Sequence, residues 1–195
     1  PSVQRDLRRR RPRVKRRQLL RGAVPWAATA LWPVWAQTPA PTPQGGAATE
    51  TSTIAATFGA LPPPQRIQRV FAAGAPAGVL VAALAPEKLL GWPMQLSDSA
   101  RQLLGAAPAA LPYLGRLAGR GSTVSVETLL QLRPDLILDA GTADATYVSG
   151  VRRVSEQTGL PTVLVQGRLA EHAAQLREVG QLLGVPERAA RLAAN

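Results

Sequence analysis

The chain has 195 residues, 46% of them hydrophobic and 18% charged, which is enough for one sizeable core and too little for two. It has no cysteine and one histidine, His172, so disulfide frameworks, thiolate zinc sites, thiol catalysis and poly-histidine metal sites within this chain are excluded. The formal net charge is +11, but residues 1–21 carry +9 of it and residues 22–195 only +2. The remainder of the chain therefore lacks the basic character of a nucleic-acid-binding domain.

Residues 1–36 have the pattern of an export signal. The basic run KRRQLLR at 15–21 precedes a mostly apolar stretch that ends in Val34-Trp35-Ala36, with small side chains where a signal peptidase cuts. Paired arginines, a spacer and two leucines resemble the twin-arginine signal. The apolar stretch is shorter than the roughly 20 residues of a membrane-spanning helix. We expect a signal peptide over 1–36; the alternative, a basic arm for nucleic acid or an anionic membrane, needs neither the apolar run nor the Ala36 site.

The segment after the predicted signal has the composition of a linker. Residues 38–53, TPAPTPQGGAATETST, are rich in Pro, Thr, Gly and Ala and have no apolar periodicity. Such a composition does not build a core. We therefore expect a flexible linker over 37–65 and a folded lobe over 66–184.

A strand–helix alternation begins near residue 66. The apolar run 69–73 predicts a strand that ends at Gly74-Ala75-Pro76, and 77–84 predicts a short buried helix. Residues 89–92 predict a second strand. Ser97 is a typical N-cap for a helix over 98–104, and 105–121 predict a loop with a short extended piece at 113–114.

The second half of the lobe repeats the alternation more clearly. Ser125 caps a predicted helix that Arg133-Pro134 ends, and 136–138 form an apolar strand. A helix over 147–158, with Gly159 as its C-cap, leads to a strand at 162–165. Two further helices follow, over 169–183 and from Pro186 onward.

This order predicts an α/β fold: a small parallel sheet with helices on both faces, one Rossmann-like lobe. Ligands of such sheets bind beyond the carboxyl ends of the strands. These ends are the Gly- and Pro-rich turns 74–76, 92–94, 139–141 and 166–168, a composition that is also ordinary turn chemistry.

Five segments in this order resemble the periplasmic substrate-binding proteins of ABC importers for iron–siderophore complexes, haem and cobalamin, the helical-backbone metal receptors. They are RVFAAGAPAGVLVAAL, PEKLLGWP, SVETLLQLRPDLILDAG, TGLPTVLVQGRL and LREVGQLLGVPERAARLA, and they cover residues 66–195. The resemblance implies two α/β lobes joined by a long helix, with ligand between them. We expect residues 185–195 to be the start of that helix, with the second lobe absent from this sequence.

The resemblance assigns several residues to a ligand cleft. Tyr147 opens a helix after a strand end, where family members use an aromatic side chain to stack on or ligate the cargo; the alternative is a packing role. Trp92 resembles a cleft-wall aromatic, although tryptophan more often packs in a core. Tyr113 and Pro76, each next to a strand end, are further ligand-binding candidates.

Charged candidates complete the set. Arg120 and Arg168 lie near cleft loops and would pair with carboxylates of an anionic cargo, while the alternative is a solvated surface arginine. The family places a glutamate at the position of Glu127 to dock on permease arginines; the alternative is a helix-dipole partner. His172, in the first turn of a helix, is expected to be a neutral, solvent-facing residue and not a metal ligand.

No catalytic pattern is evident in the sequence. Asp135 and Asp139 bracket one strand and stand about 13 Å apart, too far for a carboxylate dyad. There is no Ser-His-Asp order, no P-loop and no GxGxxG motif. We expect a periplasmic solute-binding component, not an enzyme, that needs no cofactor, binds an iron complex or cobalamin, and delivers it to an ABC permease. An exported α/β enzyme and a nucleic-acid-binding protein led by the basic arm are the alternatives.

Overall fold

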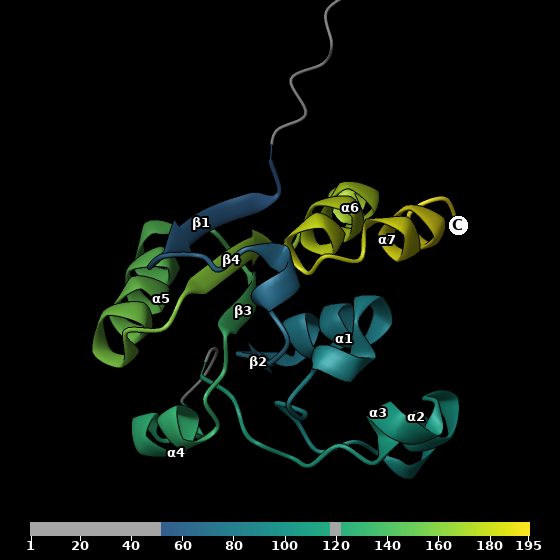
Figure 1. Ribbon diagram of the computed structural model, residues 1–195, viewed down its shortest axis with the longest axis horizontal. Coiled ribbons are helices and arrows are strands. Elements are labelled where there is room, and N and C mark those ends of the chain that lie inside the picture. The colour runs from purple at the N-terminus through teal and green to yellow at the C-terminus, as the bar shows by residue number, and fades with distance from the viewer. Residues whose placement is uncertain (1–51, 118–121) are drawn as a thin grey trace, which may run out of the picture. The chain divides into compact units, whose positions relative to one another are not determined.

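The computed structural model describes residues 52–117 and 122–195, which fold around one small sheet (Figure 1). The predicted signal peptide, 1–36, lies outside the described residues. Within the described ranges, no helix has the length and hydrophobicity needed to cross a membrane.

Four strands form the sheet, in the order β1-β4-β3-β2. They are β1 (Ile54–Phe58), β2 (Val70–Ala72), β3 (Leu136–Gly141) and β4 (Thr162–Gln166). The strands β2, β3 and β4 are parallel, which confirms the predicted parallel sheet. In contrast, β1 runs antiparallel along β4 and makes the sheet mixed.

The linker prediction over 37–65 is wrong where the structure describes that range. Residues 54–58 are the edge strand β1, with alternating half-buried and exposed side chains. Its start is held by Glu178, whose carboxylate accepts hydrogen bonds from the Thr53 and Ile54 amides. Its end packs under Arg152, whose guanidinium carbon lies 5.4 Å from the centre of the Phe58 ring.

Seven helices and three 3-10 turns accompany the strands in the described parts of the chain. The helices are α1 (Ala75–Leu84), α2 (Asp98–Leu103), α3 (Ala106–Ala109), α4 (Val126–Gln131), α5 (Ala145–Thr158), α6 (His172–Leu182) and α7 (Pro186–Leu192). The 3-10 turns are η1 (Pro64–Arg66), η2 (Pro86–Lys88) and η3 (Leu169–Glu171). The helix predicted over 169–183 is therefore split into η3 and α6.

Three predicted helix ends are confirmed, whereas the helices predicted from 77 and 147 each begin two residues earlier, at Ala75 and Ala145. The hydroxyl of Ser97 accepts a hydrogen bond from the Ala100 amide, and that of Ser125 accepts one from the Thr128 amide. Gly159 ends α5 with a φ of 68°, a left-handed conformation that glycine adopts without strain.

Two predicted extended pieces exist only as single bridges that continue the parallel order beyond β2. Leu89 pairs with Val70, and Trp92 pairs with Tyr113. The predicted strand at 89–92 is therefore reduced to these bridges, because η2 and the turn at Pro93 leave it too short for a ladder.

Helices cover both faces of the sheet, as predicted (Figure 1). One face presents Val70, Leu138 and Val163 to α1, α6 and α7. The other presents Phe71 and Ile137 toward α4 and α5. Both faces are apolar because these parallel strands are buried on both sides.

The last two helices pack tightly on each other. A Cβ built on Gly180 would lie 2.1 Å from the Cβ of Ala189, so only glycine allows this approach. The buried Lys88 fastens the turn between them, since its Nζ donates to the Leu183 carbonyl at 2.6 Å. The helix α7 begins at Pro186, the predicted residue; its continuation as an inter-lobe helix stays a prediction.

Candidate functional site

The carboxyl ends of the parallel strands form one edge of the lobe, which we call the strand-end edge (residues 73–76, 141–144 and 166–169). Its turns are joined by backbone hydrogen bonds: the Gly167 amide donates to the Gly141 carbonyl at 3.0 Å. The Leu117 amide donates to the Ala73 carbonyl at 2.9 Å. Pro76, in the first turn of α1, is exposed at this edge.

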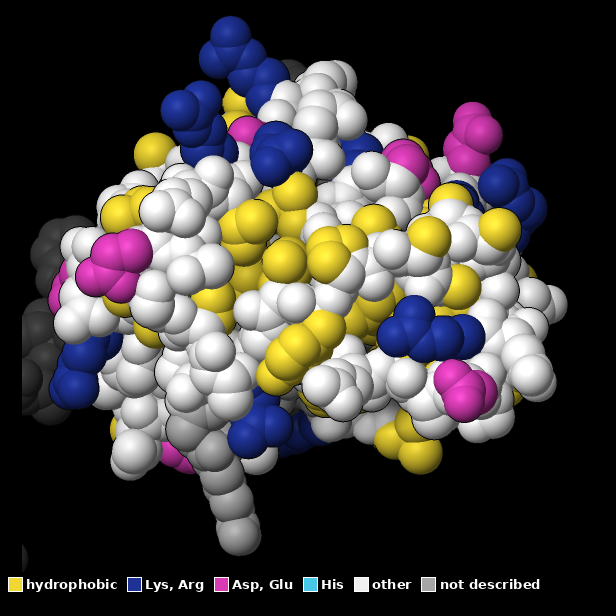
Figure 2. All heavy atoms as spheres, turned by 90° about the horizontal axis from the view of Figure 1, so that it is seen from below, with side chains coloured by type: hydrophobic (Ala, Val, Ile, Leu, Met, Phe, Trp, Pro, Cys, Tyr) yellow, Lys and Arg dark blue, Asp and Glu magenta, His cyan; other side chains and the backbone are white. Residues whose placement is uncertain are grey.

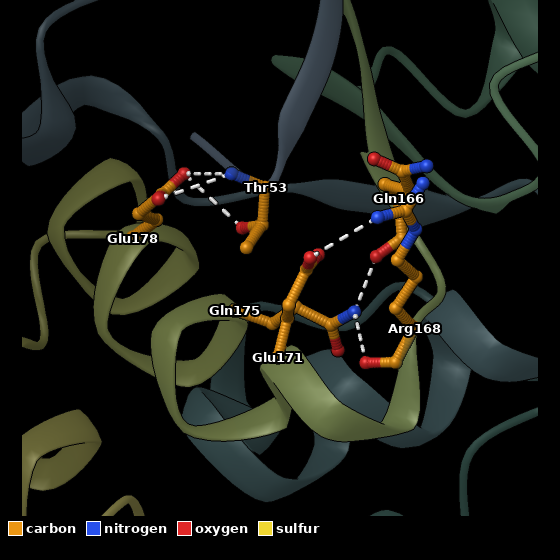
Figure 3. A network of polar contacts seen from close by, with 6 residues as sticks. All are labelled: Thr53, Gln166, Arg168, Glu171, Gln175 and Glu178. Atoms are coloured by element: carbon orange, nitrogen blue, oxygen red, sulfur yellow. Dashed lines mark hydrogen bonds and ion pairs between the residues drawn. The ribbon is translucent and has the colours of Figure 1, made fainter. Parts of the chain in front are cut away.

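A polar network fixes Arg168 at the strand-end edge (Figure 3). Gln175, from α6, donates through Nε2 to the carbonyls of Gln166 and Arg168. The Arg168 Nη1 lies 3.4 Å from Oε1 of Glu171. With the Gln166 amide oriented to satisfy its neighbours, its oxygen accepts from Nε and Nη2 of Arg168 at 3.1 and 3.2 Å. The Arg168 side chain is nevertheless 63% exposed, and the adjacent Leu169 is 90% exposed.

Tyr147 is tied to a buried carboxylate. Its hydroxyl donates to Oδ2 of Asp139 at 2.9 Å, and the Ala140 amide donates to Oδ1 at 2.8 Å. Gly141 makes the approach possible, because a Cβ there would lie 3.1 Å from the Tyr147 ring. The Tyr147 side chain therefore packs on the sheet, and its hydroxyl faces β3.

Burial governs the ionisation of this pair. Only 2% of Asp139 is exposed, and the loss of solvation raises the pKa of its carboxyl although the bonds from Tyr147 and Ala140 pull it down. Burial, followed by the charge of Asp139 and the hydrogen bond to it, raises the pKa of Tyr147. The phenol is therefore protonated at neutral pH.

A hollow of about 350 Å³ lies beside this pair, between α5 and the sheet. Its lining residues are Ala73, Leu117, Ile137, Asp139, Asp144, Thr146, Tyr147, Gly150, Val151, Val154 and Thr162. The hollow lies on the face of the sheet, since it extends from Asp144 at the strand-end edge to Thr162 at the start of β4.

The expectation that Trp92 forms a cleft wall is wrong for the described lobe. The residue is 2% exposed within the core, and its ring N–H donates to the Pro108 carbonyl at 2.8 Å. Tyr113 is 49% exposed, with its hydroxyl 3.5 Å from the hydroxyl of Thr123. Arg120 lies outside the described residues.

The remaining predicted residues are at the surface. Glu127 is exposed in the first turn of α4, where hydrogen bonds from its own amide and from the Ser125 hydroxyl lower the pKa of its carboxyl. His172 is exposed at the start of α6, with Nδ1 3.4 Å from Oε1 of Gln175. In the part of the chain that the structure describes, no three His, Asp or Glu side chains are grouped to hold a metal ion.

Asp135 and Asp139 are separated as expected. The Asp135 carboxylate accepts hydrogen bonds from the Gln68 and Arg69 amides before β2, at the opposite end of β3 from Gly141. The two aspartates therefore share no site.

The lobe also has an exposed apolar surface. Figure 2 shows the molecule from below, where hydrophobic side chains gather in a broken band with Lys and Arg around it. Helices α2 and α4 are lowest in Figure 1, and their exposed large hydrophobic residues are Leu103 and Leu130. We assign this surface no ligand.

Comparisons with known proteins define the class. Residues 81–195 match the model of the periplasmic binding protein family. Because the match covers more than half of the sequence, the chain belongs to the periplasmic binding protein family. No curated protein matches the chain.

Solved structures of low sequence identity are similar to part of the chain, and the first of them has a TM-score above 0.5. An ABC transporter solute-binding protein from Sulfurospirillum deleyianum is 23% identical with a TM-score of 0.56, over 69% of this chain and 42% of that one. A periplasmic solute-binding protein from Veillonella parvula is 19% identical, with a TM-score of 0.48 over 66% and 39% of the two chains. The haem-binding protein HmuT is 20% identical, with a TM-score of 0.45 over 66% and 39%. The chain thus spans about two fifths of the length of these proteins.

Proposed function

We propose that the chain contributes one lobe of an exported solute-binding protein that holds an iron complex (a siderophore or haem) or cobalamin and delivers it to an ABC permease in the inner membrane. The observation that carries this proposal is the family match over 81–195, together with a strand-end edge that presents a fixed, exposed arginine. The work of such a protein is binding, with no chemical step.

Arg168 is the strongest cargo contact. Its neighbours hold the guanidinium in place, so little side-chain entropy remains to be lost when it pairs with a carboxylate of the cargo. The exposed Leu169 places an apolar side chain directly next to this charge. A flat or apolar ligand that carries carboxylates, such as haem or a carboxylate siderophore, matches this combination of a positive charge and an apolar side chain.

Other predicted contacts keep smaller roles. Pro76 and Tyr113 are exposed and supply apolar surface near neighbouring strand ends. Tyr147 presents the edge of its ring to the cargo, because its hydroxyl already donates a hydrogen bond to Asp139. Arg120 stays a proposed contact on the resemblance alone.

Glu127 is the proposed permease contact. It is exposed, and its lowered pKa keeps the carboxylate charged at neutral pH. A charged group in the first turn of a surface helix is accessible to an arginine of a partner. An exported enzyme is less favoured, because the family match is to binding proteins.

The test is direct binding by the full 195-residue chain. We would titrate it with haemin, a ferric carboxylate siderophore and cyanocobalamin, and follow haemin by its absorbance and the others by equilibrium dialysis. We expect one of the three to bind, and Arg168→Gln to weaken binding about tenfold or more, since a charge-assisted hydrogen bond contributes about 1.5–3 kcal/mol.

Arg153→Gln is the matched control, because Arg153 is an exposed arginine on α5 that lies outside the strand-end edge. Absence of binding by all three compounds would refute the cargo class. Equal affinity of the two variants would remove Arg168 from the site.

A further inference from the structure

The hollow beside α5 has the form of a small-molecule site, of which the proposed transport function uses only the ring edge of Tyr147. Its floor is buried and comes from the parallel strands, with Ile137 and Asp139 on β3. Val151 and Val154 of α5 form a wall. Gly150 stands exposed at the rim, so the hollow is open to solvent. Its volume of about 350 Å³ falls within the range of small-ligand pockets.

The carboxylate of Asp139 is the chemically distinctive group in the hollow. It is 2% exposed and accepts two hydrogen bonds, from Ala140 and Tyr147. A carboxylate has about four acceptor positions, so capacity for a further donor remains. A buried charge with unused capacity is stabilised by a donor that carries positive charge.

Of the lining residues that the structure describes, the charged side chains are all acidic. Asp139 and Asp144 are acidic, and no lysine, arginine or histidine is among the described residues that line the hollow. Hydrogen bonds, first from the Tyr147 amide and then from the Thr142 hydroxyl, lower the pKa of Asp144. That carboxylate is therefore charged at neutral pH and repels anions from the rim.

We propose that this hollow is a binding site for a small organic cation, whose apolar body packs on Ile137, Val151 and Val154 and whose ammonium group binds Asp139. The ammonium adds a third donor to the two that Asp139 already has and neutralises the buried carboxylate. Once the cation is bound, its apolar body and the apolar lining together exclude water from the pair and strengthen it. Within residues 52–117 and 122–195, the lining of this site includes neither Arg168 nor Pro76, and Tyr147 is the one residue that it shares with the proposed cargo contacts.

Gly150 is a suitable position for a substitution that closes the site. A Cβ built there meets no atom within 4 Å, so a larger side chain fits without disturbing α5. Since Gly150 lines the hollow, Gly150→Leu places its side chain at the mouth. Ser149→Leu is the matched control, because it adds the same side chain at the preceding exposed position, which does not line the hollow.

The experiment is calorimetric titration of the full chain with benzylammonium, benzyl alcohol and benzoate. We expect benzylammonium to bind about tenfold tighter than benzyl alcohol, as one charge-assisted hydrogen bond requires, and benzoate not to bind. Gly150→Leu should weaken benzylammonium binding about tenfold or more, and Ser149→Leu should leave it unchanged.

The substitution Asp139→Asn tests the charge of this side chain while keeping its shape. The variant should weaken the binding of benzylammonium about tenfold and leave the binding of benzyl alcohol unaffected, a difference that a purely structural role of Asp139 would not produce.

Equal affinities for the ammonium and the alcohol, no binding of benzylammonium, or an unaffected Gly150→Leu variant would each overturn the proposal. The Gly150 result decides the matter if the Asp139 variant does not fold. Haemin titration of Gly150→Leu should match the unmodified chain, so this proposal and the transport proposal fail independently.

Discussion

Replacing Glu178 by alanine should loosen the edge strand that the sequence does not reveal. The carboxylate accepts hydrogen bonds from the amides of Thr53 and Ile54 and from the hydroxyls of Ser52 and Thr53, at 2.9 to 3.2 Å. Thr53 is fully buried, so its amide finds no water when the acceptor is removed. An orphaned buried donor costs about 1–3 kcal/mol, whereas the exposed Ser52 regains water at little cost. We expect Glu178→Ala to destabilise the protein by about 1–3 kcal/mol.

Urea unfolding followed by far-ultraviolet circular dichroism measures this loss. With a slope of about 1–3 kcal/mol per molar, the midpoint should fall by roughly 1 M. Gln181→Ala, at an exposed position of the same helix, is the control. If the two variants differ by less than about 0.5 kcal/mol, the carboxylate does not anchor β1.

The same contact predicts a pH dependence. Burial alone would raise the pKa of Glu178, but the hydrogen bonds from Thr53, Ser52 and Ile54 outweigh it, and the pKa is lowered on folding. The stabilisation is therefore full above the unfolded pKa, about 4.3, and is lost as pH falls through the folded value. The gap between the unmodified chain and Glu178→Ala should be largest at neutral pH and close in acid; a gap that widens in acid would contradict the assignment.

Three further substitutions test the packing. Gly150→Ala should stabilise the protein by about 0.5–1 kcal/mol in urea unfolding, because the site is open and alanine favours a helix; destabilisation would show that α5 is crowded there. Gly180→Val should cost about 1–3 kcal/mol by driving α6 from Ala189; a neutral effect would show that the α6–α7 contact is loose. Lys88→Met should cost about 1–3 kcal/mol by orphaning the Leu183 carbonyl; an unchanged thermal midpoint would refute a structural role for the ammonium.

Local pattern predicted most of the lobe because its core strands are continuous apolar runs and its helices have clear caps. Ser97, Ser125 and Gly159 each act at the predicted helix end. Strand β1 escaped prediction because its short sequence follows a Pro- and Gly-rich stretch. Its partner β4 lies more than 100 residues away, and its anchor is Glu178.

Side-chain direction was harder to predict than position. The sequence places Tyr147 after a strand end. Its hydroxyl nevertheless faces inward, because it donates a hydrogen bond to Asp139 on β3 and Gly141 leaves room for the ring. Trp92 is also at the end of a predicted strand, yet its side chain is buried. Burial is possible because the Pro108 carbonyl of α3 accepts a hydrogen bond from the ring N–H. A lone aspartate at the end of an apolar strand is the sequence signal that points to the hollow beside α5.

Hydrogen–deuterium exchange of the full chain, with and without whichever of haemin, the ferric siderophore or cyanocobalamin binds most tightly, tests the central claim most directly. If the strand-end edge holds the cargo, amides in 74–77 and 166–171 should exchange more slowly in the complex, while those of α6 beyond Gln175 remain unchanged. Slower exchange confined to other elements, with both of these segments unaffected, would contradict the account.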